Sequence, residues 1–235
     1  EQSFHRSLFC LLLRYKALRG GGMQAALGGE VFAALRTSLD ARFECFASPL
    51  NCRYRSYCSS FPDTDEVFGS LGSFFAFAPT SGSYQLNPPF VDTLIFAMAS
   101  RVEELLVRAE ELREALTFVM VVGANGGSRQ KKIWQRLRSS RFHRKEVLVK
   151  HNEHGYYEGE QHIAKDPVRT STCDTGSFVW QTTRAHENAA AVDVVRCLTE
   201  GFHASRPTQS ERIRRPKRAK SHKRYPPVKS AKTKN

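Results

Sequence analysis

A short aromatic run that predicts a buried strand, a tight polar loop and a long helix follow one another between residues 74 and 116, and this succession constrains the fold most. Tyr84–Leu86 leads into the loop Asn87–Phe90, whose sequence is Asn-Pro-Pro-Phe. The apolar residues after the loop recur at three- and four-residue spacing, which predicts a helix with one buried face. They are Leu94, Ile95, Met98, Val102, Leu105, Leu106, Ala109, Leu112 and Leu116. Open α/β sheets bind ligands at the carboxyl ends of their strands, so the loop is predicted to belong to a ligand site.

The loop has the groups that are needed to orient an amino group on a planar ring. Such an amine is a poor nucleophile because its lone pair is delocalised into the ring. The Asn87 side-chain oxygen and the Pro88 carbonyl can both accept hydrogen bonds from it, and Pro88 and Pro89 stiffen the backbone. The ring of Phe90 can stack on a base. These four residues are the candidate catalytic residues, and the alternative is an ordinary turn, since Asn-Pro and Pro-Pro also open turns.

Alternating helices and strands predict an α/β fold with a mostly parallel sheet and helices on both faces. Besides the long helix, helices are expected over residues 4–19, 30–39, 53–60 and 131–137. Strands are expected over residues 43–46, 74–78, 118–122, 145–150 and 177–182. Residues 151–159 are expected to form a polar, aromatic loop. The predicted division is a helical segment over 1–40, a domain over 41–205 and a basic tail over 206–235.

The positive charge is concentrated at the C-terminal end of the chain. Residues 206–235 contain twelve Lys and Arg against one Glu, a net +11, which leaves about +2 of the total +13 for residues 1–205. With almost no apolar content, this segment is expected to be disordered alone and to act as a nuclear-localisation signal or a nonspecific RNA-binding arm. A merely solubilising tail is the alternative. The rest of the chain is long enough for one domain with a sizeable core.

The cysteines predict neither a metal site nor a disulfide framework. The six of them form no C-x-x-C pair and no Cys/His cluster with zinc spacing. We expect reduced, mostly buried thiols inside the cell, and no metal. The apolar run Leu8–Leu13 is too short to span a bilayer and precedes Arg14, so it indicates neither a membrane anchor nor a signal peptide. Since the chain begins at Glu1, further sequence is expected upstream.

Two turns after expected strands are candidates for binding a cofactor. The first, which could bind an adenosyl methyl donor, lacks a G-x-G-x-x-G pattern, and an ordinary turn is the alternative. It consists of Phe46, Ala47, Ser48, Pro49, Leu50 and Asn51. The second, Gly123–Gly127, is rich in glycine, but no Gly-Lys-Ser/Thr follows it. We interpret it as a strand-to-helix loop.

Several short sequences in a common order resemble the phosphorylated CTD-interacting factor family. They are Phe43–Asn51, Tyr57–Cys58, Phe61–Asp65, Phe68–Ser70, Phe77–Pro79 and Ser81–Ser83, followed by Asn87–Phe90. A looser likeness continues through Arg141–Phe142, Val147, His151–Tyr156, Gln161–His162 and Phe178, so that it covers roughly residues 4–185. Members of this family are cap-specific adenosine N6-methyltransferases, which act beside the 7-methylguanosine cap of mRNA.

The resemblance implies a Rossmann-like class I methyltransferase fold, S-adenosyl-L-methionine as the donor and capped mRNA as the partner. Asn87–Phe90 matches the catalytic motif of the family, and Phe46–Asn51 is similar to its cofactor-binding turn. Asp63 and Asp65 would be further cofactor candidates. By the same resemblance, the segment near the substrate groove would provide His151, Glu153, His154 and Tyr156, for which a solvated loop is the alternative.

Three features depart from the pattern of the family. The sequence shows no WW domain, so binding to a phosphorylated polymerase tail is not implied; the N-terminal helical region is short; and Gly123–Gly127 replaces a Trp-bearing polar segment. Details of substrate recognition are therefore expected to differ, and a partner protein that completes the substrate groove stays an open expectation. The alternative functions are N6-adenine methylation of other RNA or of DNA, and a catalytically silent RNA-binding role. We expect the protein in the nucleus.

Overall fold

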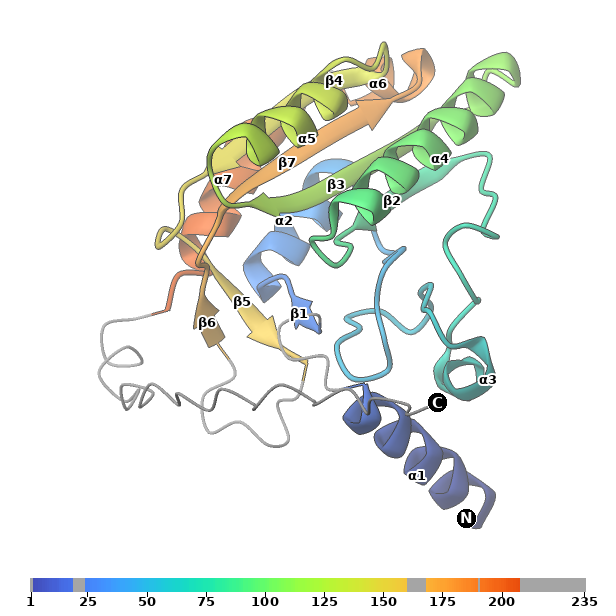
Figure 1. Cartoon of the computed structure of the whole chain (residues 1–235). Coiled ribbons are helices and arrows are strands. Elements are labelled where there is room, and N and C mark those ends of the chain that lie inside the picture. The colour runs from blue at the N-terminus through green and yellow to red at the C-terminus, as the bar shows by residue number, and fades with distance from the viewer. Residues whose placement is uncertain (1, 19–23, 160–167, 190, 208–235) are drawn as a thin grey trace, which may run out of the picture.

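A four-stranded sheet forms the centre of the computed structural model, which describes residues 2–18, 24–159, 168–189 and 191–207 (Figure 1). The strands lie in the order β2 (Gly82–Leu86), β3 (Leu116–Ala124), β7 (Asp174–Gln181) and β4 (His143–Val149). β2 and β3 are parallel, whereas β7 is antiparallel to both β3 and β4. The α/β class is therefore confirmed, but the sheet is mixed rather than mostly parallel, because the last strand enters it between two strands of the opposite direction.

The sheet continues beyond β2 through isolated bridges instead of regular strands. Glu44 forms parallel bridges to both Gln85 of β2 and Tyr57, and Tyr57 forms a parallel bridge to Ser70. Backbone hydrogen bonds follow the same direction, since the Cys45 amide donates to the Gln85 carbonyl at 2.8 Å. The parallel pairing that the sequence predicts is thus found in this part of the chain and between β2 and β3.

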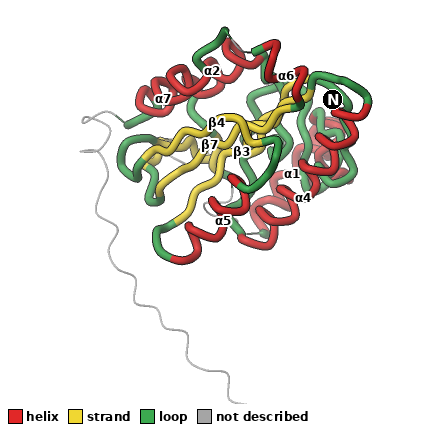
Figure 2. The backbone as a smooth tube through the Cα atoms, turned by 90° about the horizontal axis from the view of Figure 1, so that it is seen from above, coloured by secondary structure: helices red, strands yellow, loops and turns green. Residues whose placement is uncertain are grey.

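Helices cover both faces of the sheet, as predicted (Figure 2). On one face, α4 (Asp92–Glu111) and α5 (Ser128–Arg138) pack on Phe118 and the other inward residues of that face. On the opposite face, α2 (Gly29–Leu39) and α7 (Val194–Ala204) pack on Val119 and its neighbours. β3 is buried along its whole length because consecutive residues alternate between these two apolar clusters.

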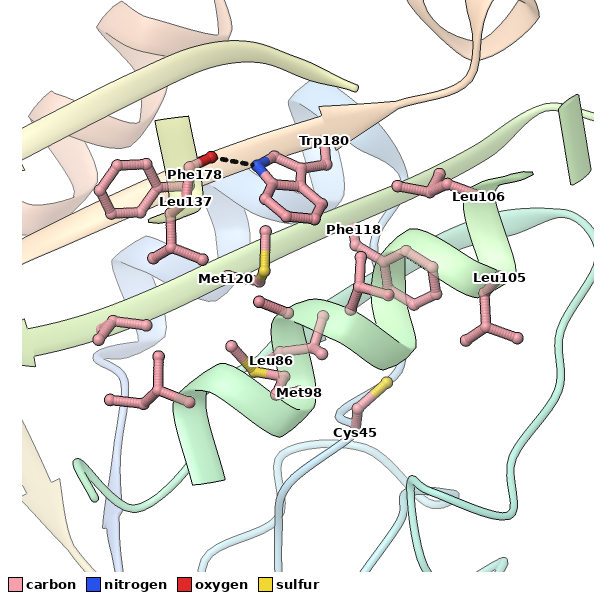
Figure 3. Close-up of a cluster of buried hydrophobic side chains, with 14 of the residues drawn as sticks. Cys45, Leu86, Met98, Leu105, Leu106, Phe118, Met120, Leu137, Phe178 and Trp180 are labelled. Carbon is pink, nitrogen blue, oxygen red and sulfur yellow. Dashed lines mark hydrogen bonds between the residues drawn. The ribbon is translucent and has the colours of Figure 1, made fainter. Parts of the chain in front are cut away.

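The apolar cluster beneath α4 contains the largest buried side chains. Trp180 is fully buried there, and its indole nitrogen donates to the Leu137 carbonyl at 2.9 Å (Figure 3). A buried indole N–H without such an acceptor would be costly, so this bond fixes the ring between the strand and the end of α5.

A smaller antiparallel sheet and several short elements complete the described structure. The small sheet has the order β1 (Ala25–Ala26), β5 (Gly155–Glu158) and β6 (Val168–Thr170). The remaining elements are α1 (Gln2–Ala17), α3 (Pro62–Asp65), the 3-10 helix η1 (Glu66–Phe68) and α6 (Thr183–Asn188). Among the residues described, no helix is both long and apolar enough to cross a membrane.

Four local predictions are wrong, and in two of them local hydrogen bonds explain why. Residues 53–60 form no helix, because the Arg53 and Tyr54 amides donate to the Glu44 carboxylate instead of to helical carbonyls. Residues 74–78 form no strand, because the Ser73 carbonyl accepts from Ala76 and Phe77 and closes a turn. Residues 43–46 contribute the two isolated bridges of Glu44 rather than a strand, and residues 151–159 contain β5 rather than only a loop.

Some predictions concern residues outside the described part of the chain. Gly20–Gly22, Gln161–His162 and the basic tail beyond residue 207 belong to this group. The predicted division at residues 40 and 205 stays a prediction. Within the described part, α2, which belongs to the predicted segment 1–40, packs against α7 and the central sheet. This helix is therefore part of the main core.

Candidate active site

A cavity of about 350 Å³ brings the Asn-Pro-Pro-Phe loop and the predicted cofactor turn together. Its wall includes Asn87 and Pro89 from the loop and Phe46, Ala47, Ser48 and Asn51 from the turn. Clefts that bind small molecules are usually about 300–1,000 Å³. The cavity wall offers aromatic rings, hydroxyls and amides, and no charged side chain of the described residues lines it. Two segments that lie about forty residues apart in the sequence therefore share one ligand-sized space.

Asn87 lines this cavity and has a buried, unpaired acceptor. Its Nδ2 donates to the Ala25 carbonyl at 2.9 Å. A carbonyl oxygen can only accept, so the amide nitrogen of Asn87 must face Ala25 and Oδ1 must face elsewhere. Oδ1 is buried and has no hydrogen-bond partner among the described residues. A buried, unpaired oxygen typically costs about 1–3 kcal/mol, which makes it a group whose partner is expected to be a ligand.

The other residues of the loop are held by the surrounding elements. Pro89 lines the cavity and its carbonyl accepts from Val91 at 2.7 Å, whereas Pro88 is buried and lies outside the cavity wall. The Phe90 carbonyl accepts from Arg129 Nη2 at 2.7 Å, and Arg129 Nε also donates to Asp92 at 2.6 Å. The loop is thus tied to the first turns of both α4 and α5.

The Phe90 ring packs away from the cavity wall. It meets the Tyr156 ring edge-on, with centroids 6.1 Å apart. A Cβ atom at Gly123 would come within 2.3 Å of the Phe90 ring, so a glycine is required where β3 passes it. The predicted stacking role of Phe90 is not tested by this arrangement and stays a prediction.

The predicted cofactor turn is a compact hydrogen-bonded turn. The Ser48 amide donates to Asn51 Oδ1 at 2.7 Å, and the Asn51 amide donates to the Ser48 carbonyl at 3.1 Å. Ser48 Oγ also donates to Gln24 Oε1 at 2.6 Å. Pro49 and Leu50 form the tip of the turn and do not line the cavity.

A buried carboxylate, that of Glu44, binds the backbone that follows this turn. Glu44 is 4% exposed, and its Oε2 accepts from the Arg53 amide at 2.6 Å and from the Tyr54 amide at 3.2 Å. Burial raises the pKa of Glu44 to about 7, because desolvation disfavours the charged form more than the two amides favour it. The chain after the turn is therefore held by a group that titrates near neutral pH.

The two aspartates that the sequence suggested for the cofactor lie outside the cavity wall. Asp63 is exposed and pairs with Arg14 Nη2 at 2.6 Å, and this hydrogen bond lowers the pKa of Asp63. Asp65 is fully buried and accepts from the Tyr15 hydroxyl at 2.6 Å. Both carboxylates thus attach α1 to α3. Through Asp65 this attachment places Tyr15 in the cavity wall.

The candidate substrate residues divide between the interior and the surface. His154 is fully buried, and its ring nitrogens contact Thr175 Oγ1 at 2.9 Å and the Lys150 carbonyl at 3.1 Å. The Tyr156 hydroxyl also bonds to Thr175 Oγ1, at 2.8 Å. Desolvation by burial lowers the pKa of His154 and raises that of Tyr156. Neither is solvated, so the solvated-loop alternative is wrong for these two.

His151 and Glu153 lie on the surface instead. His151 Nδ1 lies 3.1 Å from Asp174 Oδ1, and Glu153 Oε2 accepts from the Lys150 amide at 3.2 Å. None of the four candidate substrate residues lines the cavity. Contact of any of them with RNA stays a prediction.

The cavity also includes residues that the sequence did not single out as site residues. Gln24, Ala25 and the three residues Ser59, Ser60 and Phe61 line it. β1 has only two residues, which is too short for any periodic pattern. Ser59, Ser60 and Phe61 come directly after Tyr57 and Cys58, one of the short sequences that carry the resemblance. That short sequence could have indicated these three residues. In the described ranges there is no group of three or more His, Cys, Asp or Glu side chains placed to hold a metal ion.

The region that forms the cavity is also the region that is similar to known proteins. A family model described as the phosphorylated CTD interacting factor 1 WW domain matches residues 1–159, which include the whole cavity wall. A human protein named mRNA (2'-O-methyladenosine-N(6)-)-methyltransferase is 42% identical over 174 residues, and a mouse protein of the same name is 41% identical over 174 residues. Each match covers 70% of this chain and 24% of the relative. The chain thus spans about a quarter of the length of these relatives.

Proposed function

This chain belongs to the phosphorylated CTD interacting factor 1 WW domain family, and from that premise we propose that it is an RNA methyltransferase. The proposed reaction transfers a methyl group from S-adenosyl-L-methionine to N6 of the adenosine next to the mRNA cap. The names of the human and mouse relatives support this reaction. The observation that carries the proposal is the buried, unpaired Oδ1 of Asn87 beside the cavity that also contains Ser48 and Asn51.

The strand order supports a Rossmann-like class I methyltransferase fold. Starting from Ser70, parallel pairings lead through Tyr57, Glu44 and β2 to β3, and β7 is antiparallel to its two neighbours, β3 and β4. The cavity residues follow three of these paired segments: Phe46–Asn51 follows Glu44, Ser59 follows Tyr57, and Asn87 follows β2. In open α/β sheets this carboxyl edge is where ligands bind.

The residues of the cavity wall fit the proposed methyl donor in size and chemistry. Phe46 and Phe61 offer flat apolar surfaces to an adenine ring, while Ser59 and Ser60 offer hydroxyls to a ribose. When bound, S-adenosyl-L-methionine supplies a methyl group that is already activated, so the protein mainly positions the reactants.

In this proposal Asn87 makes the target amine nucleophilic. Its Oδ1 accepts one N–H of the adenine amine, and the Pro88 carbonyl is the proposed second acceptor. Both bonds pull the amine hydrogens out of the ring plane, which localises the nitrogen lone pair and aims it at the methyl carbon. Preorganised groups of this kind are worth about 10²–10³ in rate when one is removed. A nucleotide at the end of an RNA needs little unstacking, which suits an adenosine beside the cap.

Mass spectrometry of adenosine-starting RNA after incubation with the protein and donor tests the proposal. We expect N6-methyladenosine on capped RNA and much less on the same RNA without a cap. Equal methylation of capped RNA, uncapped RNA or DNA would favour the alternative of a general N6-adenine methyltransferase. A protein that binds no S-adenosyl-L-methionine in calorimetry and methylates none of these substrates would be the silent RNA-binding relative.

The basic segment 206–235 supports a nuclear location and additional RNA affinity. Its net charge of +11 is dense enough to bind phosphates without sequence preference. Removing residues 208–235 should weaken RNA binding and make the remaining affinity less dependent on salt, while donor binding stays the same. A fluorescent fusion of the full chain and of the shortened chain tests the location.

A further inference from the structure

The segment Gln24–Ala26, here called the strap, contacts both parts of the proposed site. Gln24 binds the cofactor turn twice: its Oε1 accepts from Ser48 Oγ at 2.6 Å, and its carbonyl accepts from Asn51 Nδ2 at 3.1 Å. The next carbonyl, of Ala25, accepts from Asn87 Nδ2 at 2.9 Å. Consecutive peptide units therefore connect the turn to the proposed catalytic side chain.

The strap is anchored mainly at these contacts. Its regular pairing is limited to two residue pairs with β5, Ala25 with Glu158 and Ala26 with Tyr157. The chain after β5 presses closely on it, because a Cβ atom at Gly159 would lie 2.6 Å from the Gln24 carbonyl oxygen and 2.7 Å from Gln24 Cβ. Because the pairing with β5 comprises two residue pairs, the hydrogen bonds of Gln24 to the turn contribute a large share of the strap's stabilisation.

These contacts also determine which way the Asn87 amide faces. An asparagine amide can rotate by about 180° and exchange its oxygen and nitrogen, since both ends have similar shapes. The Ala25 carbonyl accepts only from the nitrogen, so it selects the orientation that leaves Oδ1 unpaired. In the opposite orientation, two N–H donors would meet the N–H groups of an adenine amine, and the amine could not be held.

We propose that Gln24 is a positioning residue for Asn87, acting through the strap. By binding Ser48 and Asn51 it keeps the Ala25 carbonyl where it selects the acceptor orientation of Asn87. Binding of the methyl donor at the turn is thereby coupled to the orientation of the Asn87 amide that binds the adenine amine. This inference rests on the proposed function, because it takes Oδ1 as the acceptor for the amine.

The first test follows the Asn87 side-chain amide by nuclear magnetic resonance and needs no substrate. In Gln24→Ala, loss of about one hydrogen bond's stabilisation should speed hydrogen exchange of this amide roughly tenfold. Gln24→Glu keeps an acceptor oxygen for Ser48 and should restore most of the protection. Gln135→Ala, which changes an exposed glutamine on α5, is the matched control and should leave the exchange rate unchanged. Unchanged exchange in Gln24→Ala would overturn the proposal.

A second variant displaces the strap without changing Gln24. Gly159→Ala should push on the Gln24 carbonyl and speed the exchange of the Asn87 amide, whereas Gly29→Ala, at a position with no atom within 4 Å of the added Cβ, should not. Equal effects of the two glycine changes would contradict a role for the strap.

A double-mutant cycle on turnover separates positioning from a general structural effect. Gln24→Ala should lower turnover about tenfold in the wild-type background and have almost no effect on turnover in Asn87→Ala, because residues that act as a unit are not additive. The same factor in both backgrounds would show that Gln24 does not act through Asn87. If the wild-type protein transfers no methyl group, the proposed function fails, while the exchange measurements still decide whether the strap orients Asn87.

Discussion

The two halves of the central sheet are stabilised in different ways. In one half, β2, β3, β7 and β4 have continuous ladders between two apolar clusters. In the other half, from Phe43 to Ser70, the sheet consists of isolated bridges, and side-chain hydrogen bonds such as those of Glu44 and Tyr57 hold the loops. The cavity lies where the two halves meet, with Asn87 at the end of a regular strand and Ser48 in the irregular half.

This contrast indicates that the regular half mainly stabilises the fold and the irregular half mainly determines ligand binding. The regular half buries large apolar side chains, so its contribution is mainly to the free energy of unfolding. The irregular half buries polar groups whose bonds have one required geometry, so small changes there should alter ligand binding more than global stability.

The largest effect is expected from a change in the regular half. Phe118 is fully buried between β3 and α4, and Phe118→Ala should lower the free energy of unfolding by about 3–5 kcal/mol. Urea denaturation measures this loss. At low temperature, where the variant is still folded, its affinity for S-adenosyl-L-methionine should stay close to that of the wild type. A large loss of donor affinity in folded Phe118→Ala would contradict the proposal that the regular half contributes mainly to stability.

How far the sequence predicts each half follows from the same contrast. The apolar spacing in α4 and the buried run in β3 report burial directly, and both elements are confirmed, although α4 ends at Glu111 and Leu116 lies in β3 rather than in the helix. Periodicity failed for residues 53–60 and 74–78, because Glu44 and Ser73 redirect the local hydrogen bonds. Short sequences in a fixed order suggested Ser48, Asn51 and Asn87, which the structure places around one cavity, whereas Gln24 depends on a two-residue strand that carries no pattern.

An intermediate effect is expected from Glu44 and should depend on pH. Its folded pKa of about 7 lies above the usual value of 4.5, so the folded state binds more protons than the unfolded state between these values. Glu44 therefore contributes stability that is fully present below pH 4.5 and is lost as pH rises through 7. Relative to Glu44→Gln, which cannot ionise, the wild type should lose on the order of 2–3 kcal/mol between pH 4.5 and pH 8.

Urea denaturation of the wild type and of Glu44→Gln at several pH values measures this difference. Glu200→Gln, at an exposed position on α7, is a suitable control and should follow the wild-type dependence. Parallel stability curves for the wild type and Glu44→Gln would mean that Glu44 titrates near its ordinary value. Glu44 would then make no pH-dependent contribution to the free energy of unfolding in this range.

The smallest effect on stability is expected from Ser48→Ala. Losing the bond to Gln24 should cost about 1 kcal/mol or less of global stability, because the other contacts of Ser48 Oγ, to Asn51 Oδ1 at 3.1 Å and from the Leu50 amide at 3.3 Å, are longer and the turn keeps its backbone bonds. Calorimetry should nevertheless show about a fivefold to tenfold weaker affinity for S-adenosyl-L-methionine, since the turn forms part of the cavity wall. An equal affinity in variant and wild type would place the donor elsewhere.

Methyl transfer by Asn87→Ala, compared with that of the wild type, tests the central claim most directly. The unpaired Oδ1 is proposed to hold the adenine amine, so its removal should lower turnover on capped adenosine-starting RNA about 10²–10³-fold. Calorimetric affinity for S-adenosyl-L-methionine should change little in the same variant. Near-wild-type turnover in Asn87→Ala would contradict the account, because the cavity would then contain no acceptor on which the reaction depends.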